Sequence, residues 1–220
     1  MFIGHFGIAF GAKRAVPAVS LGALFAAAQL ADLLWPTLVL LGIERFEIRP
    51  GVTRLTPLDF IRYPYSHSLV ALAAWGVLFG MIYAAVTRSR ATAGVTLAAV
   101  VVSHWILDVL THRPDMPLTV GGPMRLGLGL WNSLPGTLAA ELLIFTTGVV
   151  VYARKTTARD RIGSIGLAAL VGFLLVVFLL NTFGPPPPSV AAVAWSAEAM
   201  WLLVIWGYWI DRHRAIVPTR

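Results

Sequence analysis

The chain contains no cysteine and few charged residues. Without cysteine there can be no disulfide bond and no thiolate metal ligand, so any bound metal must be held by His, Asp or Glu. Only 12% of the 220 residues are charged, whereas soluble domains carry about 25%. No polar stretch is long enough to enclose a core of its own. These absences exclude a separate soluble domain and predict one integral membrane domain over residues 1–220.

Hydrophobic residues make up 58% of the chain and fall into long runs. A transmembrane helix needs about 20 apolar residues. In lipid, only helices and closed barrels satisfy the backbone, and continuous apolar runs of this length are helices. The sequence therefore predicts an all-α polytopic membrane bundle of about six transmembrane helices, at about 16–43, 67–86, 91–110, 134–153, 162–183 and 190–210.

The segment before the first span is too short to cross a bilayer. Its basic pair, Lys13 and Arg14, follows the apolar stretch rather than preceding it, so we expect no cleavable signal peptide. Residues 1–12 form either a half-helix that rises into the bundle or a short amphipathic helix at the surface. Broken helices are tolerated where they line a cavity.

The distribution of Lys and Arg predicts the orientation. With the N-terminus inside, eleven of these residues lie in inner segments and six in outer loops. Basic residues concentrate on the cytoplasmic side, so we expect both termini in the cytoplasm and the two long loops, about 44–66 and 111–133, outside. The net charge of +7 is then a topology signal rather than a nucleic-acid signal, and no nucleic-acid partner is evident.

Three ionisable residues recur at intervals of four near the end of the third span. His104, Asp108 and His112 share one helical face, and Pro114 then stops the helix. His104 lies about 10 Å below the outer end, at 1.5 Å per residue. Glu141 in the fourth span has a similar depth, Asp32 lies in the outer half of the first span, and His67 opens the second.

Ionisable groups in hydrocarbon cost at least about 2.5 kcal/mol each, so they normally face a protein interior or a wet cavity. Five such residues from four spans fall in one layer, which indicates a shared site: Asp32, His67, His104, Asp108 and Glu141. Imidazoles and carboxylates without thiols suit Zn²⁺, with Mn²⁺ or Fe²⁺ as alternatives. Each residue alone could equally hydrogen-bond a neighbouring helix, and His112 could be a ligand or an interfacial side chain.

Other residues are candidates for catalysis or for substrate binding. Glu141 could accept a proton from an activated water, and Ser66 and Ser68 flank His67 and could orient it or bind substrate oxygens. Three arginines at the outer mouth could hold a phosphate-bearing headgroup, although each is also an ordinary interfacial anchor: Arg62, Arg113 and Arg125.

Three motifs resemble a known family. "GHFGIAFG" at 4–11, "YSHSL" at 65–69 and "SHWILDVLTH" at 103–112, together with Asp32, are similar to the membrane-bound metal-dependent hydrolases, also called LexA-binding, inner-membrane-associated hydrolases. A looser similarity extends to zinc-dependent phospholipase C proteins. The resemblance covers about residues 1–115 and implies a bacterial inner-membrane protein whose metal ligands are His5, Asp32, His67, His104 and Asp108.

The sequence departs from the family pattern at two places. Leu34 stands where a second acidic residue is expected, which argues against a second metal, and residues 64–66 replace a Gly-Thr pair. His5 would reach only about 12 Å above the inner surface, several ångströms short of the His104 layer. Its role as a ligand is therefore open at this point.

Three functions remain as alternatives. The first is a metal-dependent hydrolase acting on a lipid-linked or phosphate-containing substrate at the outer leaflet. The second is a transporter or a proton- or ion-conducting protein with a metal-binding polar layer, and the third is a scaffold in which the layer only joins helices. The inner halves of the spans carry almost no ionisable groups. This favours the hydrolase, with membrane lipid or a small molecule as its partner.

Overall fold

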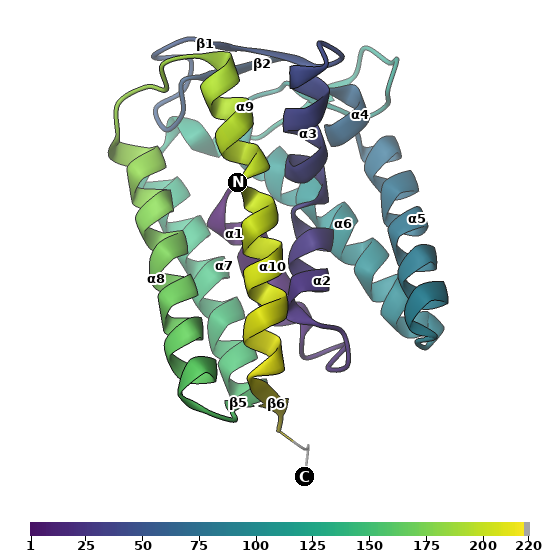
Figure 1. Cartoon of the computed structure of the whole chain (residues 1–220). Coiled ribbons are helices and arrows are strands. Elements are labelled where there is room, and N and C mark those ends of the chain that lie inside the picture. The colour runs from purple at the N-terminus through teal and green to yellow at the C-terminus, as the bar shows by residue number, and fades with distance from the viewer. Residues whose placement is uncertain (218–220) are drawn as a thin grey trace.

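The computed structural model describes residues 1–217 as a bundle of helices that run between two ends (Figure 1). The helices are α1 (Ile3–Ala12), α2 (Leu21–Ala28), α3 (Leu30–Leu40), α4 (Pro64–His67), α5 (Leu69–Thr87), α6 (Ala91–Thr111), α7 (Leu134–Lys155), α8 (Arg161–Phe183), α9 (Val190–Glu198) and α10 (Met200–Arg212). Five helices are long and apolar enough to cross a membrane, with α9 and α10 together forming one of them. A sixth is added if α2 and α3 count as one bent span. The prediction of an all-α membrane bundle is confirmed.

The first predicted span is broken at Gln29. Helices α2 and α3 meet there at an angle of 56°, and the backbone of Gln29 leaves the helical region at φ −101° and ψ 11°. The break frees the carbonyl of Ala28, which instead accepts a hydrogen bond from His104. A break of this kind is stable in a membrane only where other protein groups satisfy the freed backbone.

Helix α1 is the half-helix of the two alternatives, and it lies inside the bundle. Most of its residues are buried, and it packs along α7 through a contact between Gly7 and Gly148. A Cβ atom on Gly7 would lie 2.6 Å from the carbonyl oxygen of Ile144, so only glycine permits this approach. The chain therefore starts near mid-height in the bundle, as Figure 1 shows.

Both long loops lie at one end of the molecule. The first contains the antiparallel pair β1 (Arg45–Ile48) and β2 (Leu58–Arg62), with Phe46 opposite Phe60. The second contains β3 (Met116–Pro117), β4 (Arg125–Leu126) and the 3₁₀ turn η1 (Leu130–Asn132). An ion pair between Arg113 and Asp59 joins the two loops. The sequence predicted these loops but not their strands.

The opposite end is closed by a buried polar network. The ammonium group of Lys13 lies 2.5 Å from Asp211 and 2.7 Å from the carbonyl oxygen of Val19. The hydroxyl of Tyr152 donates to the other oxygen of Asp211. Strands β5 (Thr156–Ala158) and β6 (Arg214–Ile216) pair at the same end. The end of α1 is thus fixed to α7 and α10.

Candidate metal centre

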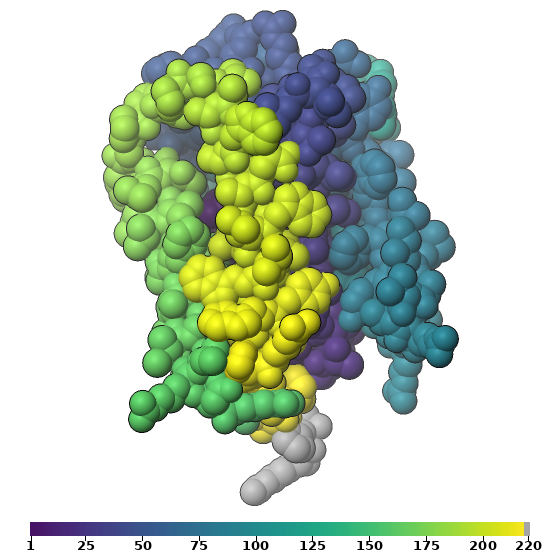
Figure 2. All heavy atoms as spheres, viewed as in Figure 1, coloured from purple at the N-terminus to yellow at the C-terminus, as the bar shows by residue number. Residues whose placement is uncertain are grey.

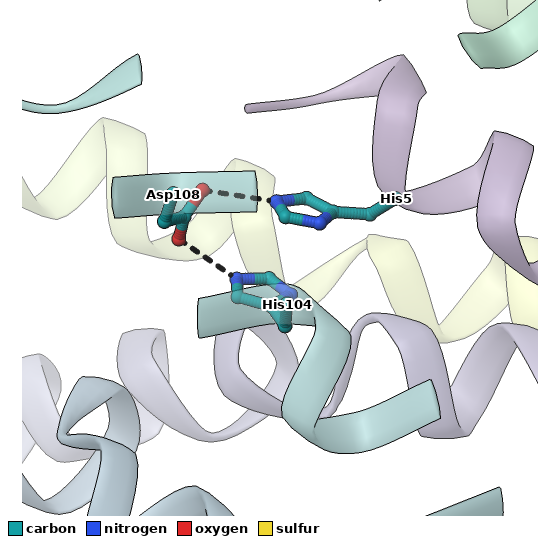
Figure 3. Close-up of side chains that lie close together, drawn as sticks. All are labelled: His5, His104 and Asp108. Carbon is teal, nitrogen blue, oxygen red and sulfur yellow. Dashed lines mark hydrogen bonds and ion pairs between the residues drawn. The ribbon is translucent and has the colours of Figure 1, made fainter. Parts of the chain in front are cut away.

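The centre is built around one face of α6. His104 and Asp108 lie one turn apart on this face, and both are almost fully buried. His5 of α1 approaches the same point, and Figure 3 shows its ring beside His104 with both rings directed at Asp108. The predicted i, i+4 spacing therefore brings the two α6 side chains to a single site.

Four ligand atoms come from three different segments. His104 Nε2 lies 3.1 Å from Asp108 Oδ2 and 3.8 Å from Asp32 Oδ1. His67 Nε2 lies 3.4 Å from Asp32 Oδ1 and 3.8 Å from Asp108 Oδ2. Two atoms bonded to one ion at about 2.1 Å are separated by about 3.0–4.2 Å. Each of these four distances is within that range, but the atoms converge as two groups that share His104: Asp32 with His67 and His104, and Asp108 with His5 and His104.

The tautomer of His104 is fixed by the break between α2 and α3. Its Nδ1 lies 2.8 Å from the carbonyl oxygen of Ala28, which can only accept a hydrogen bond. The proton of the neutral ring is therefore on Nδ1, and Nε2 presents a lone pair. This nitrogen is buried and has no hydrogen-bond donor among the described residues.

The tautomer of His67 is fixed by a second relay. The carboxylate of Glu44 accepts the backbone N–H groups of Tyr65 and Ser66 and, at 2.5 Å, the hydroxyl of Ser66. Because that hydroxyl has one proton and donates it to Glu44, its oxygen accepts Nδ1–H of His67 at 2.7 Å. Nε2 of His67 is then also a free lone pair. Second-shell partners of this kind orient metal-binding histidines.

His5 occupies a different position from the other two histidines. Its ring stacks on that of His104 with centroids 3.7 Å apart and 5° between the planes. A ring nitrogen binds a metal in its own ring plane, and two parallel planes cannot share such a point. His5 Nε2 instead lies 3.1 Å from Asp108 Oδ1, the oxygen opposite the one that faces His104. His5 therefore supports Asp108, or binds a second ion with it.

Glu141 holds the first turn of α1 in place. Its two oxygens accept the backbone N–H of Phe2 at 2.8 Å and of Gly4 at 2.7 Å. The amino group of Met1 lies 2.6 Å from Asp108 Oδ1. A carboxylate oxygen has two lone pairs, so Glu141 keeps one on each oxygen, and its side chain also lines the cavity beside the centre.

A cavity of about 960 Å³ joins this centre to the bundle surface. Its polar side includes Asp32, His67 and Asp108, and its apolar side is formed by α8, α9 and α10. A volume of this size is at the upper end of the range of about 300–1,000 Å³ for ligand sites. The ligand atoms are therefore accessible from a space that can hold a substrate.

The three predicted substrate-binding arginines lie away from this cavity. Arg113 pairs with Asp59 and Asp115, Arg125 donates to the carbonyl oxygen of Gly122, and Arg62 is exposed at the end of β2. Within residues 1–217, the arginine on the cavity wall is Arg54, which was not singled out in the sequence. No ion pair in that range involves it.

His112 and the two serines have structural contacts. His112 Nδ1 donates to Asp115 at 2.9 Å, and burial lowers the pKa of His112 despite this carboxylate. His112 lines the cavity but is in neither group of convergent ligand atoms within residues 1–217. Ser68 caps α5 by accepting the N–H of Ala71, and Ser66 takes part in the relay to His67.

Glu44 is the main residue of the site that was missed in the sequence. It lies in the first long loop and resembles an ordinary acidic loop residue. Its only sequence signal is its position one residue before β1, in a loop that returns to the "YSHSL" motif. Its burial, at 2% exposure, becomes evident only when the loop is folded.

Comparisons with family models, with curated proteins and with solved structures return no match for this chain. The fold and the site define its class by themselves. The protein is a multi-pass membrane bundle that encloses a His/Asp cluster beside a large cavity.

Proposed function

We propose that the protein is a membrane-embedded metal-dependent hydrolase acting on a lipid-linked or phosphate-containing substrate. One observation carries the proposal. In their neutral forms His67 and His104 each present an Nε2 lone pair, and both nitrogens lie 3.1–3.8 Å from carboxylate oxygens of Asp32 and Asp108. A cation between its members would hold such a set of acceptors together, and neutral imidazole with carboxylate favours Zn²⁺.

In this proposal the His/Asp cluster binds the ion, and a separate carboxylate accepts a proton from the water. A divalent ion in this shell would lower the pKa of a water ligand and polarise a phosphoryl or carbonyl oxygen. Glu141, with a free lone pair on each oxygen and its side chain on the cavity wall, accepts the proton. Arg54 at the rim neutralises an anionic substrate group, which is the role first considered for Arg62, Arg113 and Arg125.

The family resemblance supports the same function. The residues that carry it, His5, Asp32, His67, His104 and Asp108, are the ones whose side chains converge. We extend the proposal to location: a bacterial inner membrane, both termini in the cytoplasm and the loop end outside. The basis is the excess of Lys and Arg at the end that holds β5 and β6.

A transporter is the competing function. It would need a polar path through the other half of the bundle. Among the described residues, the buried charged groups there are Lys13, which pairs with Asp211, and Arg214, which donates to Thr156 and to the carbonyl oxygen of Gly163. We therefore favour the hydrolase.

Metal analysis of purified protein tests the proposal. The wild type should hold a stoichiometric divalent ion, His104→Ala should lose it, and His213→Ala should keep it. His213 is a matched control because it pairs with Asp160 at the opposite end. Two imidazolium–carboxylate pairs would give the same contacts without metal, and metal-free wild-type protein would support that arrangement.

Activity assays then separate the functions. A hydrolase should release a headgroup or its phosphomonoester, or a fatty acid, from phospholipid micelles, and His104→Ala should remove both metal and turnover. Turnover that persists without metal would defeat the hydrolase scheme. Metal flux into liposomes without turnover would establish the transporter.

A further inference from the structure

Helices α8 and α10 contact each other in their lower halves and separate above. Gly166 of α8 lies against Trp209 of α10, and the rings of Phe173 and Trp206 are 5.8 Å apart. Beyond this point the next turns of α8 and of α9 no longer close on each other but form opposite walls of the cavity, with Val177 on one side and Val193 on the other.

The cavity reaches the outer face of the membrane-spanning helices. Three of its wall residues are strongly exposed, Phe173 at 46%, Leu180 at 64% and Leu202 at 65%. Two others are deep, Phe178 at 2% and Leu203 at 7%. Figure 2 shows the hollow between α8 and α9, with the N-terminal segment visible inside it. One continuous wall thus leads from the bundle exterior to the histidine cluster.

The connector between α8 and α9 fits this opening. It contains four consecutive prolines, and residues 185–187 line the cavity. A polyproline segment extends about 3.1 Å per residue and is stiff. Packed helices lie about 8–10 Å apart, so this connector can hold α8 and α9 further apart than direct contact requires. Proline also donates no hydrogen bond that would close the gap.

We propose that the hollow is a lateral portal that binds one acyl chain of a bilayer phospholipid. The opening lies within the membrane-spanning part of α8, Val177 being about 9 Å below the end of the helix at 1.5 Å per residue, so lipid is the solvent there. The acyl chain lies between α8 on one side and α9 with the first turn of α10 on the other, and the headgroup lies toward Asp32, His67 and Arg54. The position of the acyl chain stands by itself, whereas cleavage of the lipid rests on the proposed function.

Photo-crosslinking in vesicles tests the portal. The probe is phosphatidylglycerol with a diazirine near the end of one acyl chain, mixed into phosphatidylcholine vesicles that contain the protein. We expect adducts on Phe178 and Leu203, which lipid on the outer surface cannot reach. Leu174 is fully buried on the same helix without lining the cavity, and it should stay unlabelled.

A filled portal provides the matched comparison. Ala197→Trp places an indole in the cavity wall, whereas Ala191→Trp adds the same group to the exposed face of the same helix. The first variant should lose the adducts on Phe178 and Leu203, and the second should keep them. Val177→Phe is a milder block for use if Ala197→Trp does not fold. Labelling of Val86, exposed on α5, should be unchanged in every variant.

Several outcomes would overturn the portal. Adducts confined to outer residues such as Val86 would show a hollow occupied by water, detergent or a second copy. Adducts on Phe178 that survive both blocking variants would show a different route. Metal content measured on the same samples separates the two proposals. His104→Ala should lose metal and keep its adducts on Phe178 and Leu203. Wild-type protein that binds metal but gives no adducts on these two residues would contradict the portal and leave the hydrolase proposal standing.

Discussion

Residues outside the proposed coordination shell determine which ring nitrogen of His67 and of His104 carries the proton. Ala28 accepts from His104, and Ser66 accepts from His67 because Glu44 takes its hydroxyl proton. Both imidazoles are thereby oriented with a lone pair toward Asp32 and Asp108. A change in the outer partner should alter the centre without removing a ligand.

Glu44→Gln tests this relay. The amide of glutamine would donate to Ser66, the serine would then donate to His67 Nδ1, and His67 Nε2 would carry the proton. We expect metal affinity to fall about 10–100-fold, as for other second-shell changes, in a folded protein. Chelator competition measures the affinity. Glu47→Gln, which alters an exposed carboxylate in the same loop, is the control. Equal metal affinities for the two variants would show that the Glu44–Ser66–His67 hydrogen bonds do not affect metal binding.

A pH dependence is expected at Asp115, outside the spanning helices. Burial opposes its ionisation, but hydrogen bonds from His112, Tyr63 and Arg113 outweigh burial and hold the pKa of Asp115 below its ordinary value. A carboxyl with a depressed folded pKa stabilises the protein above its unfolded pKa, and this is lost as pH falls through the folded pKa. Asp115→Asn should cost about 1–3 kcal/mol at pH 7. Thermal unfolding should show the difference shrinking on acidification, and a constant difference would contradict the assignment.

The glycine contact between α1 and α7 is the decisive feature at the level of elements. Gly148 lies against the backbone of Gly7, so a side chain at either position forces the helices apart. Because α1 carries His5 and begins against Glu141, its docking also shapes the wall of the centre.

Gly148→Ala should therefore destabilise the bundle by about 1–3 kcal/mol, as overpacking does. Proteolysis of the N-terminal segment should become faster in this variant. Gly172 on α8 has open space around it, so Gly172→Ala should be neutral or stabilise its helix by up to about 1 kcal/mol. If the two variants unfold alike, helix propensity rather than the close approach determines the effect.

The predictability of these elements from sequence differed with the range of the interaction. His104 and Asp108 are four residues apart on one helix, so their shared face follows from helical geometry alone. The polar Gln29 interrupts the apolar run of the span predicted at 16–43, but with no glycine there the sequence did not show that the helix bends at this residue. The burial of α1 required the Gly7–Gly148 contact, whose partners are far apart in the chain. Glu44 was missed for the same reason, since only the folded loop brings it to Ser66.

At the scale of the whole molecule, the two ends differ in charge. The proposed orientation places Met124 outside and Arg159 inside. Because the chain has no cysteine, Met124→Cys and Arg159→Cys each introduce a unique thiol at an exposed position. In intact cells a membrane-impermeant maleimide should label only the first, and permeabilisation should expose the second. The reverse pattern would invert the topology and place the cavity mouth at the cytoplasmic face.

The order in which the segments are made has a consequence for assembly in the cell. Helix α1 is synthesised before α7, yet it packs along α7, which begins more than a hundred residues later in the chain. Until α7 has been inserted, the N–H groups of Phe2 and Gly4 have no Glu141 carboxylate to bind, and Gly7 has no Gly148 to pack against. Maturation of the centre is therefore a late event, and a nascent chain that stops before α7 cannot assemble it.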